Sequence, residues 1–172
     1  ATPKHDTPHP PLVGEAFDRT ILGTAYGIDH TNSFSNLYTG HRQSAIEPCG
    51  CAHNPLGGID REARIDARLA ETSMPVVRVD AGGFLKTNPN QPAIMRARYL
   101  FAAWQELKID AVNVGAVDLG AGLQFLRDMQ TSYSLPFISA NLVSSADGEL
   151  LFPPYLVKTI TLQSGDKYRL GI

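Results

Sequence analysis

The segment Val76-Val77-Arg78-Val79-Asp80-Ala81-Gly82-Gly83 indicates the fold of this chain. Its valine-rich first half is typical of a buried strand, and the glycine pair that follows is typical of a loop. The same order recurs at residues 111–114, a short apolar run followed by a turn at 115–120. Residues 137–139 form another such run. Short apolar runs separated by longer segments predict the buried strands of a largely parallel sheet.

The segments between these runs have helical patterns. Residues 59–72 predict a first helix that Met74-Pro75 ends, and Pro92 opens a second helix at its first turn. A third helix is predicted over residues 121–130. The residues expected on the inner faces are Ile59, Ala63, Ala67 and Ala70 in the first helix, and Met95, Tyr99, Ala102 and Leu107 in the second. Strands that alternate with helices predict an α/β fold, in which ligands gather at the carboxyl ends of the strands.

The two ends of the chain complete the predicted organisation. Residues 1–17 hold Pro3, Pro8, Pro10 and Pro11 and predict an extended arm, which precedes a single domain over residues 18–172. Further strands are expected at Asp18–Leu22 and Phe34–Thr39. Tyr155–Leu162 and Tyr168–Ile172 predict an antiparallel pair, because Ser164-Gly165-Asp166 between them is typical of a turn.

Composition excludes several classes of protein. The 172 residues carry a net charge of −2, so we expect no basic face for nucleic acid. No apolar run approaches the roughly 20 residues that cross a bilayer. The chain begins with Ala1 and a proline-rich stretch, which is typical either of the mature end of an exported precursor or of a trimmed chain.

Four segments share their order and spacing with one known family. They are Val79-Asp80-Ala81-Gly82-Gly83, Val114-Gly115-Ala116-Val117-Asp118, Pro136-Phe137-Ile138-Ser139-Ala140-Asn141 and Pro154-Tyr155. They resemble the Asp-x-Gly-Asp, Val-Gly-Asn-His-Glu, Pro-x-x-x-Ala-Asn and Pro-Tyr segments of the 5'-nucleotidase-like (calcineurin-like) metallophosphoesterases. Gly57-Gly58-Ile59-Asp60-Arg61 likewise resembles the start of the family's first helix. The resemblance covers residues 36–172 and implies the N-terminal half of a layered sheet with flanking helices.

Catalysis in that family uses two metal ions that clamp the phosphate and activate a water molecule. At the positions of the family's ligands, this chain has Gly83 for the bridging aspartate, and Ala116 and Val117 for the Asn-His pair. The family's first Asp-x-His falls near His41 and Gln43 if the first strand is residues 35–38, and on serines if that strand begins earlier. We therefore expect a degenerate site with no dinuclear metal centre and no phosphoester hydrolysis.

Two polar residues of the matching segments remain. Asp118 stands at the glutamate of Val-Gly-Asn-His-Glu, and Asn141 stands at the Ala-Asn position. We expect Asn141 to act as an amide that satisfies a turn.

Both cysteines lie in Glu47-Pro48-Cys49-Gly50-Cys51. This loop resembles a subgroup of extracytoplasmic 5'-nucleotidase-like proteins that carry Cys-Gly-Cys, some of them associated with multihaem cytochromes. The resemblance implies redox chemistry in place of hydrolysis. Independently, a Cys-x-Cys disulfide closes a small ring that is strained and easily reduced. A helix that starts near Ile59 would favour the thiolate if its N-terminus points at the loop.

Other interpretations of the cysteine loop stay open. His41, Cys49, Cys51 and His53 are four potential ligands for a single Zn or Cu ion. Alternatively, the two cysteines only shape the loop. For the whole chain, the alternatives are a redox accessory domain, a non-catalytic interaction subunit and a residual phosphoesterase. Half of a layered sheet leaves surface to cover, so we expect a protein partner or a further C-terminal half. The resemblance to extracytoplasmic proteins implies a periplasmic or secreted location.

Overall fold

A computed structural model describes residues 30–48 and 57–172. Its centre is a four-stranded parallel sheet in the order β1-β2-β3-β4. The strands are β1 Ser35–Thr39, β2 Val76–Asp80, β3 Ala111–Asn113 and β4 Phe137–Ile138. The predicted α/β class and these predicted strands are confirmed. The predicted arm at 1–17 and the strand predicted at Asp18–Leu22 lie outside the described residues.

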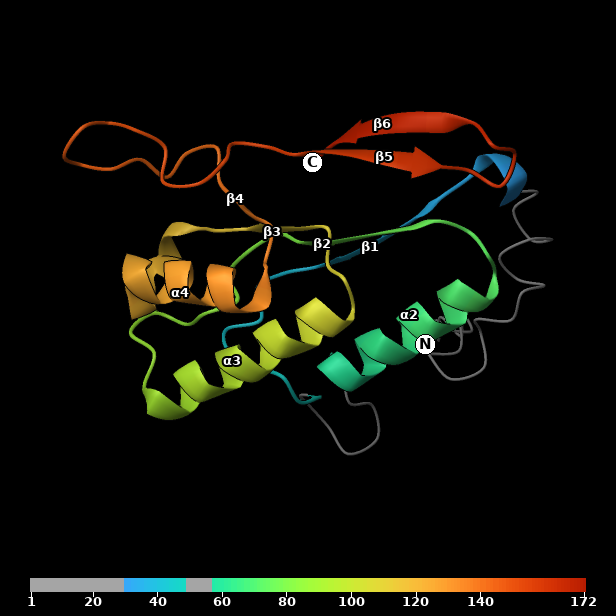
Figure 1. Ribbon diagram of the computed structural model, residues 1–172. Helices are drawn as coiled ribbons and strands as arrows, with labels where there is room; N and C mark the ends of the chain where they lie inside the picture. Colours follow the sequence, from blue (N-terminus) through green and yellow to red (C-terminus); the bar gives the residue numbers. More distant parts are fainter. Residues whose placement is uncertain (1–29, 49–56) are drawn as a thin grey trace, which may run out of the picture.

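Three helices cover one face of the sheet, as Figure 1 shows. They are α2 Ile59–Glu71, α3 Gln91–Glu106 and α4 Leu123–Tyr133, and two 3-10 turns are η1 His30–Asn32 and η2 Ala116–Ala121. The start of α3 follows from its sequence, because the Asn90 side chain accepts a hydrogen bond from the Ala93 N–H at 3.1 Å and proline stands in the first turn.

Aromatic residues dominate the core between the helices and the sheet. The Phe84 ring makes edge-on contacts with Phe101 and Trp104, at centroid distances of 5.5 and 5.6 Å, and stacks on Phe137 at 5.8 Å. Val112 of β3 is buried in the same cluster. Because these rings come from α3, β4 and the loop after β2, their burial fixes that loop against the helices.

The inner face predicted for α3 was wrong. Met95 and Tyr99 are 59% and 63% exposed, while Ala102 and Leu107 are half-buried. The buried residues of this helix are Ala93, Ala97, Leu100, Phe101 and Trp104. The buried stripe carries more apolar area than the predicted one, so its removal from water stabilises the fold more.

The stripe predicted for α2 was also partly wrong. Ala67 and Ala70 are exposed, and Leu69 is the buried residue of this helix. Two acidic side chains of α2, Glu62 and Asp66, instead make ion pairs with arginines of the sheet layer. Small alanines gain little from burial, whereas the ion pairs hold the charged stripe toward the sheet.

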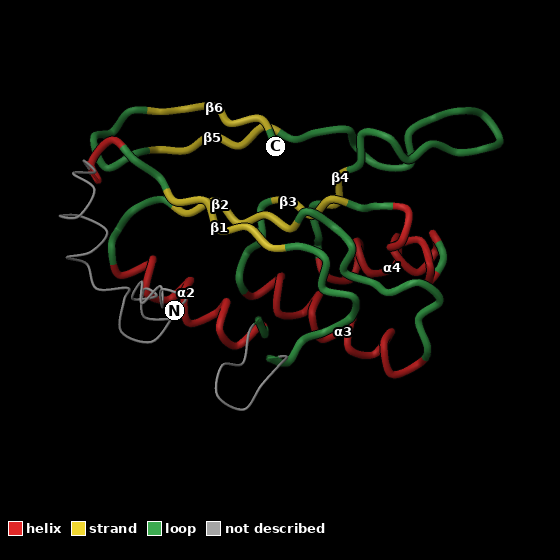
Figure 2. Tube along the Cα trace, turned by 180° about the vertical axis from the view of Figure 1, so that it is seen from behind, coloured by secondary structure: helices red, strands yellow, loops and turns green. Residues whose placement is uncertain are grey.

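A hairpin lies on the opposite face of the sheet (Figure 2). Its strands are β5 Val157–Thr161 and β6 Lys167–Gly171, and they pair antiparallel as predicted. Ile160 and Leu162 pack on Val77 of β2 to form a second small core. In the described part of the chain, no helix has the length and apolar character to cross a membrane.

Candidate functional site

The loops that follow β1 and β2 run side by side at the carboxyl edge of the sheet. The His41 N–H donates to the Gly82 carbonyl at 2.7 Å, and the Gln43 N–H donates to the Gly83 carbonyl at 2.9 Å. These bonds continue the β1–β2 pairing beyond the end of the strands. The two segments that sequence comparison singled out are therefore held in contact by backbone hydrogen bonds.

Three of the sequence-predicted positions meet in this region. The side chains of His41 and Gln43 approach each other, with 2.8 Å between their Nε2 atoms. Gly83 packs against His41, since a Cβ on Gly83 would lie 3.2 Å from the His41 Cα and 3.3 Å from its Nδ1. Gly83 also has a φ of +70°, a conformation that an aspartate adopts only with strain. The backbone conformation and the close contact with His41 therefore favour glycine at position 83, which the sequence motifs match to the family's bridging aspartate.

The backbone around His41 is itself unusual. His41, Gln43 and Ser44 have φ values of +55°, +50° and +64°. Left-handed conformations at residues other than glycine cost of order 1 kcal/mol each and gather at functional sites. The turn after β1 is thus a specific conformation that its surroundings maintain.

Ala116 and Val117 begin η2, the turn after β3. Their side chains hold no atom that could bind a metal ion, and Val117 is 46% exposed. Asp118 follows them and is fully buried. Its carboxylate accepts hydrogen bonds from the N–H groups of Leu85 and Gly83, both at 2.9 Å, and Gly115, at 3.0 Å. It braces the loops after β2 and β3 against each other.

Burial affects the acidity of this aspartate. Desolvation raises the pKa of Asp118 above its ordinary range, while the backbone N–H groups of Leu85, Gly115 and Gly83 act to lower it. Both carboxylate oxygens are already occupied by hydrogen bonds. Asp118 therefore acts as an internal acceptor for the backbone.

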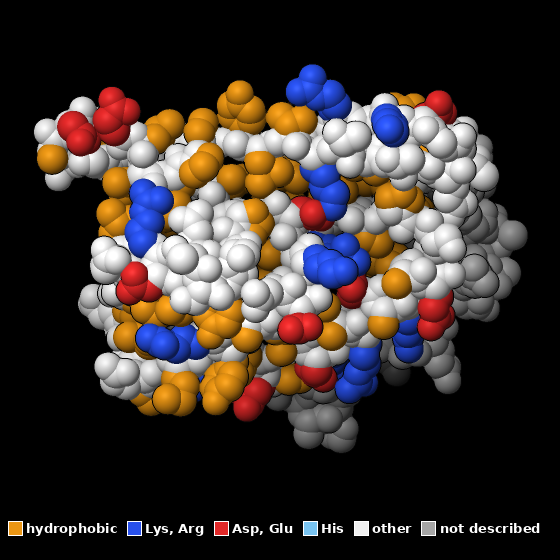
Figure 3. Space-filling view, viewed as in Figure 1, with side chains coloured by type: hydrophobic (Ala, Val, Ile, Leu, Met, Phe, Trp, Pro, Cys, Tyr) orange, Lys and Arg blue, Asp and Glu red, His pale blue; other side chains and the backbone are white. Residues whose placement is uncertain are grey.

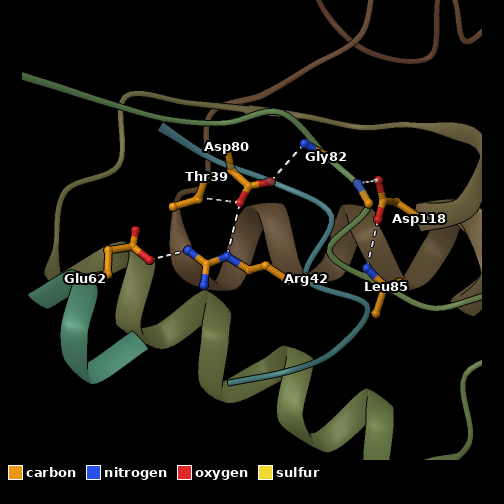
Figure 4. Close-up of polar contacts among 8 residues, drawn as sticks. Thr39, Arg42, Glu62, Asp80, Gly82, Leu85 and Asp118 are labelled. Atoms are coloured by element: carbon orange, nitrogen blue, oxygen red, sulfur yellow. Dashed lines mark hydrogen bonds and ion pairs between the residues drawn. The ribbon is translucent and has the colours of Figure 1, made fainter. Parts of the chain in front are cut away.

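A buried ion-pair cluster, formed by Thr39, Arg42, Glu62 and Asp80, stands beside these loops (Figure 4). The Asp80 Oδ2 accepts from the Thr39 hydroxyl at 2.7 Å and from the Arg42 Nε at 3.2 Å. The Asp80 Oδ1 accepts from the Gly82 N–H at 2.9 Å. The other end of the Arg42 guanidinium pairs with Glu62 of α2. We call these four residues the Arg42 cluster.

The Arg42 cluster is shielded from solvent. The side chains of Arg42 and Glu62 are 9% and 11% exposed, and that of Asp80 is fully buried. Burial raises the pKa of Glu62, against the opposing effect of the Arg42 guanidinium. The guanidinium carbon also lies 5.8 Å from the centroid of the Trp104 ring, within reach of a cation–π contact. One cation thus joins β2, α2 and the loop after β1.

This arrangement does not fit a dinuclear metal centre. The carboxylate oxygens of Asp80 accept hydrogen bonds from Thr39, Arg42 and a backbone N–H. Those of Asp118 accept hydrogen bonds from three backbone N–H groups. Over residues 30–48 and 57–172, no group of three or more His, Cys, Asp or Glu side chains could hold a metal ion. The carboxylates at these strand ends bind the protein's own donors.

A cavity of about 850 Å³ opens between β1, the loop after it and the start of α2. Its lining residues are Leu37, Tyr38, Thr39, Gly40, His41, Arg42, Gln43, Ala45, Glu47, Gly57, Gly58, Arg61, Glu62 and Ile65. Of the four residues in the predicted mononuclear site, His41 borders this cavity, and Cys49, Cys51 and His53 lie outside the described residues. Glu47 and Gly57, near the two ends of the cysteine-containing segment, also line it.

Sequence reasoning missed Thr39, Arg42 and Glu62 as parts of the site. These residues precede Asp80 by 41, 38 and 18 positions, respectively. Such separations follow no periodicity that sequence analysis could detect. The Asn141 side-chain oxygen accepts from the Ser139 hydroxyl at 3.3 Å, and its predicted role as an amide that satisfies a turn stays a prediction.

Comparisons with known proteins bear on the fold. No family model matches the chain, and no curated protein matches it. It is similar to the crystal structure of a 5'-nucleotidase precursor from Thermus thermophilus, with a TM-score of 0.61 and 22% identity over 79% of this chain and 27% of that one. It is also similar to the NAD nucleotidase NadN of Haemophilus influenzae, with a TM-score of 0.59 and 17% identity over 78% and 25% of the two chains.

At these identities the likeness shows the fold alone. The chain has the α/β architecture of part of a 5'-nucleotidase-like metallophosphoesterase, as the sequence motifs predicted. It spans about a quarter of the length of the two solved structures. Its place in a degenerate Cys-Gly-Cys subgroup stays a prediction.

Proposed function

We propose that this chain is a non-hydrolytic domain on a 5'-nucleotidase-like fold, which serves as a redox-linked accessory component through Cys49 and Cys51. The main observation that supports the proposed loss of hydrolysis is the Arg42 cluster. Its guanidinium stands between the Asp80 and Glu62 carboxylates, at the carboxyl edge of the sheet where this class of fold binds ligands.

Electrostatics supports this interpretation. A divalent cation near Asp80 would meet the positive charge of Arg42 at short range in a desolvated setting, where repulsion is strong. Gly83, Ala116 and Val117 supply no replacement ligands. Polarisation of a phosphoester and activation of water both require that metal charge. The strand-end site therefore has the scaffold of a phosphoesterase without its reactive centre.

Thiol chemistry is the proposed replacement. Oxidation of Cys49 and Cys51 to a disulfide releases two electrons, which an electron acceptor such as a multihaem cytochrome would take up, and two protons, which pass to the solvent. The ends of the loop support this role, since Glu47 and Gly57 line the cavity at the carboxyl edge of the sheet. The alternative is a single Zn or Cu ion held by His41, Cys49, Cys51 and His53.

Partners and location follow from the same proposal. The chain spans about a quarter of the structures it resembles, which supports a protein partner or a further C-terminal half that completes the layered sheet. Redox exchange with a haem protein fits a periplasmic or secreted location, because disulfides persist in these oxidising compartments.

The test is a count of free thiols on the native chain before and after mild reduction, with metal analysis of the same sample. We expect two thiols to appear on reduction and no bound metal. About one equivalent of Zn or Cu with blocked thiols would support the mononuclear site instead. Thiols that are free from the start, inert to oxidants and metal-free would overturn the redox role.

A further inference from the structure

We propose that Glu62 is a proton-dependent latch, which holds the start of α2 against the loop after β1 while it is protonated and releases that contact as it ionises. The latch goes beyond the redox role, because it uses none of the residues assigned to that role. Three features support it: an excess of acid in the Arg42 cluster, a polar attachment of α2 and a cavity beside Glu62.

The Arg42 cluster holds more acidic side chains than basic ones. One guanidinium, that of Arg42, faces two carboxylates, those of Asp80 and Glu62. If both carboxylates are ionised, one positive and two negative charges leave a net charge of −1. The side chains of Arg42, Asp80 and Glu62 are only 9%, 0% and 11% exposed, so water screens this charge poorly. A proton on one carboxylate neutralises the cluster and removes that cost.

Hydrogen bonds decide which carboxylate takes the proton. The Asp80 carboxylate accepts from the Thr39 hydroxyl, the Arg42 guanidinium and the Gly82 N–H. Among residues 30–48 and 57–172, the Glu62 carboxylate accepts from Arg42 alone. Because hydrogen bonds to a carboxylate favour its ionised form, the proton goes to Glu62 rather than to Asp80.

Burial acts on Glu62 in the same direction. Desolvation raises the pKa of Glu62 above the ordinary glutamate value of 4.5. The Arg42 guanidinium opposes this rise through its charge and its hydrogen bond, while the negative charges of Asp80 and Asp66 add to it. Asp66 is itself paired with Arg78. The balance of these effects favours the protonated form while Glu62 stays inside the cluster.

The start of α2 is attached largely through polar contacts. Leu69, the buried residue of this helix, lies near its C-terminal end. At the other end, the Ile59 N–H donates to the Ile46 carbonyl at 2.9 Å, and the Glu62 side chain pairs with Arg42. Segments that bury little apolar surface open locally at a low free-energy cost. Loss of the Arg42–Glu62 contact would therefore allow the first turns of α2 to open.

The cavity of about 850 Å³ provides the space into which Glu62 moves. Glu62 and Arg42 both line it, and the other charged or titratable side chains at its wall include His41, Glu47 and Arg61. Rotation of the Glu62 side chain into this space would let water solvate its carboxylate, while Arg42 stays with Asp80. The latch therefore controls the shape of the cavity at the carboxyl edge of the sheet.

The direction of the response follows from the difference in acidity between the two forms. Glu62 binds its proton more tightly in the closed form, where it is buried, than in the open form, where water solvates it. Below pH 4.5 the side chain is protonated in both forms, and the closed form is favoured most. As the pH rises from 4.5 through the raised pKa, the closed form loses this advantage and the latch opens.

Trp104 reports on the latch, since it is the only tryptophan of the chain. The centroid of its ring lies 5.8 Å from the Arg42 guanidinium carbon. We expect the tryptophan fluorescence of the whole chain to change in one step between pH 4.5 and about pH 8, as Arg42 loses Glu62. Glu62→Gln keeps the shape of the side chain but cannot ionise, so the step should be absent in this variant.

Amide hydrogen exchange locates the opening. Over the same pH range, the protection factors in the first two turns of α2 should fall about threefold or more, because a pKa difference of one between two forms changes their ratio tenfold. Those of α3 should stay constant, since a buried apolar stripe holds that helix. In Glu62→Gln, α2 should keep its protection throughout the range.

Asp60→Asn is the matched control, because Asp60 lies in the first turn of α2 with Glu62 and its pair with Arg64 is well exposed. Figure 3 shows acidic and basic side chains interspersed along α2, at the lower right of the molecule. Removal of one exposed charge there should leave the fluorescence step in place. Burial also raises the pKa of Asp118, but both variants keep Asp118, so the difference between them reports Glu62.

A fluorescence step of equal size in the parent chain and in Glu62→Gln would overturn the latch. So would protection of α2 that rises with pH, or a loss of protection that α3 shares. If Glu62→Gln does not fold, carboxyl-carbon NMR of the parent chain tests the latch directly. A Glu62 carboxyl that titrates above 4.5 supports it, and one that titrates at 4.5 or below contradicts it. Thiol and metal analysis does not involve Glu62, so the redox role and the latch can fail separately.

Discussion

Replacement of Arg42 by alanine is expected to lower the free energy of unfolding by about 3–5 kcal/mol, because it leaves buried carboxylates without their cation. Asp80 and Glu62 both pair with this guanidinium, and their side chains are 0% and 11% exposed. The loss of the contact with Trp104 adds to the cost. Urea denaturation followed by far-ultraviolet circular dichroism measures the effect.

Arg64→Ala is the matched control for Arg42→Ala. Arg64 pairs with Asp60 at 3.4 Å in the same helix turn as Glu62, but both side chains are well exposed. An exposed pair contributes about 0–1 kcal/mol, so this variant should unfold almost as the parent does. Equal effects of the two substitutions would show that the Arg42 cluster is not a buried ion-pair network.

Asp118→Ala should destabilise the fold by a similar amount, about 3–5 kcal/mol, because a buried N–H left without an acceptor costs about 1–3 kcal/mol and a partly buried one costs less. Three N–H groups, from Gly83, Leu85 and Gly115, lose their acceptor in this variant. We expect amide hydrogen exchange at those three residues to accelerate more than exchange in the hairpin.

Asp147→Ala provides the comparison for Asp118→Ala. Asp147 also accepts a backbone N–H, from Glu149 at 3.1 Å, but it is exposed to water. Water replaces the lost acceptor there, so the expected change is below about 1 kcal/mol. A small effect of Asp118→Ala, comparable with that of Asp147→Ala, would contradict the bracing role of Asp118.

The strands were predictable because they are short apolar runs bounded by glycine or proline. Val76–Asp80 and Ala111–Asn113 follow this rule, and both are strands of the sheet. The hairpin was predictable for the same reason, with a glycine turn between two alternating segments. These signals are local, so a single sequence contains them.

The helix faces were harder to predict, since several stripes of α3 are apolar. Met95 and Tyr99 lie on one stripe, and Leu100, Phe101 and Trp104 lie on another. Only the position of the sheet decides which stripe is buried. In α2, the deciding factor was the pair of sheet-layer arginines that draw Glu62 and Asp66 inward, which is tertiary information.

The candidate site was predictable in part. Motif order identified Gly83, Ala116, Val117 and Asp118, and the structure brings Gly83 next to His41. The role of Arg42 was not predictable, because an arginine between His41 and Gln43 forms no sequence motif that indicates a buried ion pair. Its partners, Asp80 and Glu62, come from separate elements that only the fold brings together.

The most direct test of the loss of hydrolysis is phosphate release from adenosine 5'-monophosphate by the purified chain, with Mn²⁺, Zn²⁺ or Mg²⁺ supplied in excess. We predict no release above that of the metal ion alone, because Asp80 and Asp118 are committed to the protein's own donors. Metal-dependent release that disappears in a His41→Ala variant would contradict this account and establish a working metal site at the carboxyl edge of the sheet.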